Sequence, residues 1–268
     1  MRVGFSYYKD GKTRALTMSY DDGREFDLRL LQIFNLHGIR GTFHLNSALL
    51  GREEYITPED VRDKFAFHEI SGHTLTHPHL TRVSNEELIH EVLEDRKNLE
   101  VLCGYPVRGM SYPYGAYSPE VMNRLRGLGV KYSRTVVSTG NFSLPDDFLA
   151  WHPTCHHDDP RLFGLLEKFK NYKYRTMPVL YVWGHSYEFD KKNNWDHIER
   201  FCAEAGGDPD VWYATNVEIY DYWMALRALQ FTVDRTVVHN PTATDVWIEV
   251  DKSPVRIAAG ATVDLKTL

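Results

Sequence analysis

The stretch ALTMSYDDG, residues 15–23, joins an apolar run to two carboxylates and a glycine. Residues Ala15–Tyr20 favour a buried strand, which predicts that Asp21 and Asp22 stand at its carboxyl end. Side chains alternate along an extended chain, so the two carboxylates point in different directions. One of them could hold a metal while the other acts as a base on water. The alternative is that both only cap the helix that follows.

Strand-like and helix-like segments alternate from this stretch onward. The predicted strands are Ala15–Tyr20, Gly41–Leu45, Phe65–Ile70, Met110–Tyr112, Val130–Arg134, Pro178–Trp183 and Val211–Ala214. The predicted helices are Phe26–Leu36, Ser84–Leu102, one that starts at Ser118, 158–172, Asn194–Ala205 and Asn216–Leu229. About seven βα units of this kind predict an α/β fold with a parallel sheet or barrel.

The pattern changes after Gln230. Short β-rich segments, separated by Asn240-Pro241, Ser253-Pro254 and Gly260, predict antiparallel strands. We therefore expect residues 1–230 to form the barrel and residues 231–268 to form a small β-rich extension.

Composition excludes several classes of protein. The 268 residues include 31 basic and 37 acidic ones without a basic run, which argues against nucleic-acid binding. No segment approaches the ~20 apolar residues of a membrane span. Three widely spaced cysteines, Cys103, Cys155 and Cys202, favour free thiols in a reducing compartment. Residues 1–16 lack the apolar core of a signal peptide, so we expect a cytoplasmic protein unless a leader was removed.

Four polar clusters follow predicted strands, where the active site of a parallel barrel collects. They are Asp21-Asp22-Gly23, residues 71–78, Pro113-Tyr114-Gly115 and Gly184-His185-Ser186. His73 and His77 are four residues apart, and on one turn two such imidazoles can bind the same metal. Two histidines with one carboxylate are typical of a catalytic metal centre with open positions.

In their order and separation these clusters resemble the motifs of the polysaccharide deacetylases of carbohydrate esterase family 4. The motif T-F-D-D-G is similar to residues 17–23, H-[ST]-x-x-H to His73–His77, and P-[YF]-G to residues 113–115. The last motif, a strand that ends in leucine and histidine, resembles Leu180–His185. The resemblance covers residues 14–229 and implies a distorted (β/α)7 barrel of the polysaccharide-deacetylase type.

The resemblance also implies roles for single residues. Asp21 would be the catalytic base and His185 the general acid that protonates the leaving amine. The backbone N–H of Tyr114 would bind the oxyanion. Asp22, His73 and His77 would hold one divalent metal ion, with Zn²⁺ expected and Co²⁺ or Ni²⁺ as alternatives, because the same ligands suit several ions.

Two departures from the family pattern call for substitutes. Ser111 stands where the family usually has an arginine that holds the catalytic aspartate. We hypothesise that Arg134 takes that role. The alternative is that Arg134 is only a charged residue on the surface. The family's tryptophan-bearing motif has no clear match. Trp151, in a histidine-rich loop from Ser138 to Asp158, is expected to contact substrate, as are Pro113 and Trp183. A polar lid without chemistry is the alternative for that loop.

The sequence therefore predicts a metal-dependent hydrolase that removes an acyl group from an amino sugar or an oligo- or polysaccharide, and N-acetyl is the acyl group that we expect. Two alternatives stay open: a related metal-dependent amide or formyl hydrolase with a small substrate, and a non-catalytic carbohydrate-binding homologue. The expected partner is an N-acetylated saccharide, and formation of a homo-oligomer is left open.

Overall fold

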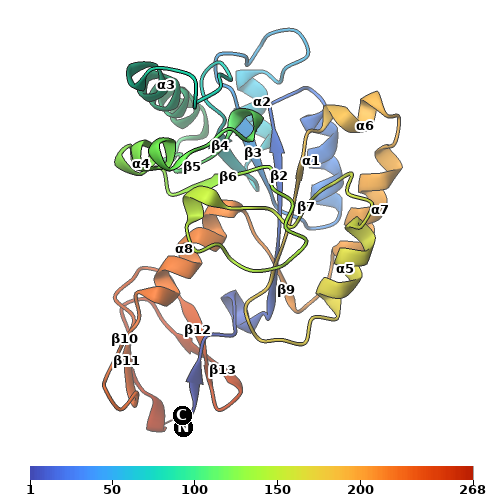
Figure 1. Ribbon diagram of the computed structural model, residues 1–268. Helices are drawn as coiled ribbons and strands as arrows, with labels where there is room; N and C mark the ends of the chain where they lie inside the picture. The colour runs from blue at the N-terminus through green and yellow to red at the C-terminus, as the bar shows by residue number, and fades with distance from the viewer. Residues whose placement is uncertain (268) are drawn as a thin grey trace.

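The computed structural model describes residues 1–267 and is built around one parallel sheet that curls into a barrel (Figure 1). The sheet order is β6-β5-β4-β3-β2-β8-β7, and β9 pairs with the start of β2. The strands are β2 (Arg14–Asp21), β3 (Gly41–Leu45), β4 (Glu69–Gly72), β5 (Gly109–Ser111), β6 (Tyr132–Arg134), β7 (Cys155–His156), β8 (Val179–Gly184) and β9 (Val211–Tyr213). The predicted (β/α)7 fold is confirmed.

Strand β2 lies at the centre of the sheet. It pairs with β8 through Ala15–Tyr20 and with β3 through Met18–Asp21. All eight of its residues are buried, as expected for a parallel strand with both faces covered. This strand therefore carries Asp21 and Asp22 to the carboxyl edge of the sheet, as the sequence predicted.

The segment from Trp151 to His156 closes the barrel between β6 and β8. Trp151 forms a parallel bridge with Arg134 at the end of β6, and Cys155 and His156 pair with β8. The long loop expected over residues 138–158 thus contains this closing strand and the short helix η3 (Phe148–Ala150). A two-residue strand carries no periodicity, so the sequence did not indicate it.

Helices cover the outside of the sheet (Figure 1). They are α1 (Asp27–Leu36), α2 (Pro58–Lys64), α3 (Asn85–Cys103), α4 (Pro119–Gly127), α5 (Leu162–Lys170), α6 (Tyr187–Lys191), α7 (Trp195–Ala205) and α8 (Asn216–Arg227). Ser84 and Ser118 cap α3 and α4, and Gly104 ends α3 in the left-handed conformation. The short helices α2 and α6 were not predicted.

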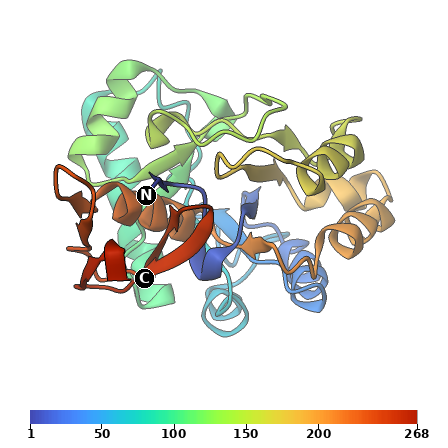
Figure 2. The same ribbon diagram turned by 90° about the horizontal axis from the view of Figure 1, so that it is seen from below.

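The β-rich extension packs against the base of the barrel and contains both ends of the chain (Figures 1 and 2). Strand β10 starts at Gln230, and the N-terminal strand β1 pairs antiparallel with β12. The two small sheets are formed by β1 (Val3–Gly4), β12 (Val246–Val250) and β13 (Ser253–Ile257), and by β10 (Gln230–Phe231), β11 (Val237–His239) and β14 (Thr262–Asp264). A single apolar cluster joins the extension to β2 and α8, so the two parts share a core.

No helix within residues 1–267 combines the length and the apolar composition that crossing a bilayer requires.

Candidate active site and metal centre

The carboxyl ends of the strands surround a cavity of about 390 Å³. Four separate polar clusters of the sequence contribute side chains to it, as predicted. The lining residues are Asp21, Asp22, His73, His77, Tyr112, Tyr114, Gly115, Val136, Trp183, His185 and Tyr187.

Asp22, His73 and His77 converge on one side of this cavity. The Oδ1 atom of Asp22 lies 3.5 Å from His73 Nε2 and 3.7 Å from His77 Nε2. Ligand atoms about 2.0–2.1 Å from a tetrahedral zinc ion stand about 3.3 Å apart, so this spacing suits a shared metal ion. All three ligand atoms lie within 4.8 Å of one another.

The protonation of His73 also suits a metal ligand. Its Nδ1 lies 3.0 Å from the carbonyl oxygen of Ser111, which can only accept, so Nδ1 carries the hydrogen and Nε2 presents its lone pair to Asp22. Burial lowers the pKa of His73 to about 3, which keeps the ring neutral. The donor set and its tautomer therefore fit a divalent metal ion.

The loop that carries the two histidines is held from behind by carboxylates of α3. Asp95 accepts a hydrogen bond from the His73 N–H at 3.1 Å, and Glu91 accepts one from the Thr76 N–H at 2.8 Å. Burial raises the pKa of Asp95 to about 7. Neither residue was predicted from the sequence, although acidic side chains on the inner face of a helix are an unusual feature.

Four non-glycine residues of the site adopt left-handed backbone conformations. Asp22 has φ 81°, Thr74 68°, His77 67° and Tyr114 57°. Each such residue costs on the order of 1–3 kcal/mol and persists where the surroundings impose it. Two of the three candidate metal ligands are therefore held in place at an energetic cost.

Asp21 is buried beside the candidate metal ligands and is paired with Arg134. The Arg134 guanidinium contacts Asp21 Oδ2, and both side chains are almost fully buried. The Ser111 hydroxyl donates a hydrogen bond to Asp21 Oδ1 at 3.1 Å. Although burial opposes ionisation, Arg134 and the neighbouring imidazoles hold the pKa of Asp21 well below its usual range. The geometry is the one hypothesised for Arg134; its part in turnover stays a prediction.

Tyr114 presents its backbone and its ring to the cavity. Its N–H makes no hydrogen bond within residues 1–267, as an oxyanion donor requires. The residue is 60 % exposed, and its ring stacks on His79 with centroids 3.9 Å apart and lies edge-on to His77 at 4.4 Å. The left-handed turn at Tyr114 therefore brings both a free donor and an exposed aromatic face to the site.

His185 faces the cavity from the end of β8 and is held by Glu188 of α6. Its Nε2 lies 4.0 Å from Asp22 Oδ2, while its Nδ1 lies 3.3 Å from Glu188 Oε1. Burial favours the neutral ring, but the bond to Glu188 and the charges of Asp21 and Asp22 raise the pKa of His185. Glu188 was missed because the sequence did not indicate the short helix that places it one turn after His185.

A second histidine cluster lies behind Glu188. Glu188 Oε2 is 3.1 Å from His156 Nε2 and 2.9 Å from His157 Nε2, and Asp158 lies next to them. The Asp158 N–H donates to His156 Nδ1 at 3.1 Å, so Nδ1 holds the lone pair and Nε2 carries the hydrogen. Lys192 also contacts the Asp158 carboxylate. We interpret this cluster as a support for Glu188 through close contacts between imidazole nitrogens and its carboxylate.

The structure corrects one predicted substrate contact and does not favour another. Trp151 is only 1 % exposed and packs edge-on against Tyr132 and Tyr181, so it belongs to the core and does not contact substrate. Its backbone closes the barrel, which explains a buried position. Pro113 is buried and is not among the cavity residues, whereas Trp183, 8 % exposed, does line the cavity.

The chain was compared with known proteins. Residues 8–133 match the family model for polysaccharide deacetylase. A chitooligosaccharide deacetylase of Sinorhizobium fredii is 26 % identical over 49 % of this chain and 61 % of its own length. A peptidoglycan-N-acetylglucosamine deacetylase of Bacillus cereus is 30 % identical over 37 % of this chain and 36 % of its own. The matched regions thus span less than two thirds of these relatives.

Two solved structures share the fold. A crystal structure of a protein from Mycobacterium smegmatis superposes with a TM-score of 0.61 at 18 % identity, covering 85 % of this chain and 96 % of the other. The chitin deacetylase of Colletotrichum lindemuthianum gives 0.52 at 21 % identity, covering 76 % and 87 %.

Fold and site together define a curled parallel (β/α)7 barrel with an Asp-His-His cluster at the carboxyl ends of its strands. Over residues 8–133, just under half of its length, the chain is similar to the polysaccharide deacetylase family. Arg134 and His185 lie beyond the matched residues, so their roles depend on the geometry described above.

Proposed function

We propose that this protein is a metal-dependent hydrolase that removes an acyl group, most often N-acetyl, from an amino sugar within an oligo- or polysaccharide. The observation that supports this best is the meeting of a metal-ligand set, a buried ionised carboxylate and a carboxylate-paired histidine in one cavity. The names of the relatives, deacetylases of chitooligosaccharides and of peptidoglycan, agree with it.

Asp22, His73 and His77 would hold the metal ion, for which we propose Zn²⁺, with Co²⁺ or Ni²⁺ as alternatives. When bound, such an ion polarises an acyl oxygen and lowers the pKa of water. Asp21, kept ionised by Arg134, accepts the proton of the attacking water as the new C–O bond forms. The Tyr114 N–H donates a hydrogen bond to the negative charge that develops on the acyl oxygen.

The C–N bond then breaks, and His185 donates a proton from Nε2 to the leaving nitrogen. Glu188 holds the opposite ring nitrogen and stabilises the charged imidazole. The acid and the base therefore come from the ends of two neighbouring strands, β8 and β2. Trp183 and the exposed ring of Tyr114 offer apolar faces to a sugar ring.

The decisive experiment combines metal analysis with product release. The purified protein is expected to contain about one divalent metal ion per chain and to release acetate from N-acetylglucosamine oligosaccharides. His77→Ala should lose both properties, while the matched variant His79→Ala, two residues along the same loop, should keep its metal. Release of formate or cleavage of small amides without acetate release would favour the alternative hydrolase, and metal binding without turnover of any of these compounds would favour a binding protein.

A further inference from the structure

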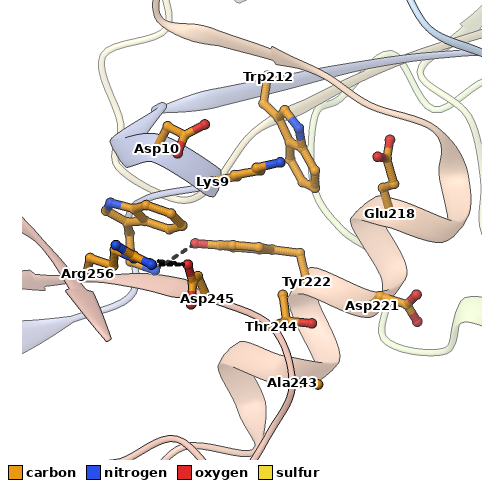
Figure 3. Close-up of a pocket in the computed structure, with 11 residues that line it drawn as sticks. Lys9, Asp10, Trp212, Glu218, Asp221, Tyr222, Ala243, Thr244, Asp245 and Arg256 are labelled. Carbon is orange, nitrogen blue, oxygen red and sulfur yellow. Dashed lines mark hydrogen bonds and ion pairs between the residues drawn. The ribbon is translucent and has the colours of Figure 1, made fainter. Parts of the chain in front are cut away.

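A second and larger cavity, of about 630 Å³, lies near the start of β2, where Trp212 of β9 pairs with Ala15. Figure 3 shows the residues that line it. Its walls come from the N-terminal turn η1 (Lys9–Gly11), from β9, from α8 and from the extension. The cavity adjoins the start of β2, whereas the active site lies at its end. Asp21 lies six positions after Ala15, which corresponds to about 20 Å of extended chain. This cavity, which we call the basal crevice, is therefore separate from the active site.

The basal crevice has an aromatic lining. Tyr222 is buried, and its ring lies 5.4 Å from that of Trp212 at an angle of 60°. Trp212 and Trp247 are half-buried, so part of each indole faces the crevice. Neither indole N–H has a hydrogen-bond partner within residues 1–267. These rings offer apolar faces with free donors at their edges.

The polar groups of the crevice are fixed in place. Arg108 binds Asp221 through two hydrogen bonds, of 2.8 and 2.5 Å, and Arg256 binds Asp245 at 3.0 Å. The Tyr222 hydroxyl donates to the Tyr7 carbonyl at 2.9 Å and accepts from the backbone N–H of Trp247 at 3.0 Å. Carboxylates oriented in this way keep free acceptor positions, so the lining is organised before a ligand arrives.

The turn η1 carries the remaining polar side chains. Figure 3 shows Lys9 and Asp10 entering from this turn, opposite Tyr222 and Asp221 of α8. Neither Lys9 nor Asp10 forms a side-chain hydrogen bond or ion pair within the described part of the chain. A Cβ atom at Gly11 would lie 3.3 Å from Pro254, so the turn rests directly on the extension. The crevice thus presents an uncommitted donor and acceptor beside its aromatic faces.

We propose that the basal crevice is a non-catalytic binding site for one or two sugar units of a saccharide chain. Stacking of a sugar's C–H face on an indole, flanked by fixed carboxylates and free N–H donors, suits a ring with many hydroxyl groups. Four carboxylates and two cations line the crevice, which disfavours acidic sugars. The choice of a saccharide over another polar ring compound depends on the proposed function. The site would hold a substrate chain while another part of it reaches the active site.

The test measures binding of an N-acetylglucosamine tetrasaccharide to the Asp22→Ala protein, which cannot turn it over. Calorimetry gives the affinity, and NMR signals of the indole N–H groups report where the sugar lies. Trp212→Ala should weaken crevice binding about tenfold or more. Ala243→Phe, which fills the exposed rim without removing a core contact, should do the same. Trp223→Ala, a tryptophan of α8 outside the crevice, is the matched control and should leave the affinity unchanged.

The inference is overturned if saturating sugar leaves the Trp212 signal unmoved, or if Trp212→Ala and Ala243→Phe both keep the full affinity. Its failure can be told apart from failure of the proposed function. If sugar binds at the crevice but the protein never releases acetate, the proposed binding site stands and the proposed enzymatic function fails. If the protein releases acetate but the crevice variants do not change the tetrasaccharide affinity, the proposed enzymatic function stands and the proposed binding site fails.

Discussion

Two histidine clusters flank His185, and they contain almost the same kinds of side chain. One consists of Asp22, His73 and His77, and the other of His156, His157, Asp158 and Glu188. Their atoms are similarly spaced, at 3.5–3.7 Å in the first and 2.9–3.1 Å from Glu188 in the second. By composition and distance alone, both clusters would therefore be assigned as metal sites.

A hydrogen bond on the far side of one ring in each cluster, His73 in the first and His156 in the second, distinguishes the two clusters. A carbonyl oxygen of Ser111 fixes the hydrogen of His73 on Nδ1, which leaves Nε2 free to bind a metal. A backbone N–H of Asp158 fixes the lone pair of His156 on Nδ1, so Nε2 must donate. The lesson is that the backbone group behind a histidine decides whether it acts as a ligand or as a donor.

The largest effect is expected from Asp22→Ala. It removes the carboxylate shared by His73 and His77, so the protein should lose its metal and acetate release should fall about 10³-fold or more. His156→Ala is the matched test of the second cluster and should keep one metal ion per chain. Mass spectrometry of the purified proteins measures this. Two metal ions in the parent protein, or loss of its single metal ion in His156→Ala, would mean that the second cluster binds metal.

Arg134→Met should act on both stability and turnover. It leaves the Asp21 charge buried without its partner, which costs roughly 3–5 kcal/mol of unfolding free energy. Chemical denaturation measures the loss. The double variant with Asp21→Asn should recover much of the stability without recovering activity. If Arg134→Met turned over substrate like the parent, Arg134 would have no part in holding the base.

The carboxylates of Glu69, which is buried, and Glu188, which is half-buried, show how neighbouring donors affect the pKa of a carboxyl group. Glu188 is surrounded by three imidazoles and its pKa is held well below its usual range, although burial opposes this. Glu69 accepts bonds from neutral groups, among them Tyr132 and the Val217 N–H, and burial raises its pKa to about 7. The folded protein thus holds the Glu69 proton more tightly than the unfolded chain does.

That difference predicts how stability depends on pH. The stabilising contribution of protonated Glu69 is complete below its unfolded pKa, near 4.5, and is lost as pH rises through 7. Between pH 5 and pH 8 the parent should therefore lose about 2 kcal/mol relative to Glu69→Gln. Urea titrations of both proteins at the two pH values test this. Parallel pH profiles would mean that Glu69 titrates normally.

Most of the barrel and of the candidate metal site could be predicted from the sequence, for a physical reason. Strands such as Ala15–Tyr20 have an apolar pattern of their own, and Asp21, His73 and His185 directly follow such strands. Parallel strands bring their carboxyl ends to one edge, so residues far apart in sequence could be expected to meet there. Arg134 was found by the same argument.

The features that could not be predicted from the sequence depend on tertiary contacts. Glu188 lies on a five-residue helix that is too short for a periodic signal. The bridge of Trp151 to Arg134 depends on how the chain closes the barrel, and nothing in the composition of residues 138–158 indicates it. The pairing of β1 with β12 likewise joins opposite ends of the chain. Such features follow from the whole fold and have no local pattern.

The smallest effect, and the sharpest test of the comparison, is expected from Glu188→Gln. The amide keeps the size of the side chain and one acceptor oxygen but removes the charge that supports His185, so kcat should fall about tenfold with KM and metal content unchanged. The loss should shrink for acetate esters with good leaving groups, because these need no proton from His185. In the His185→Ala background the same substitution should add little, since it acts through the absent ring. An equal loss for every leaving group, or full additivity with His185→Ala, would make Glu188 a purely structural residue. Loss of metal in Glu188→Gln would instead make the second cluster a ligand site after all.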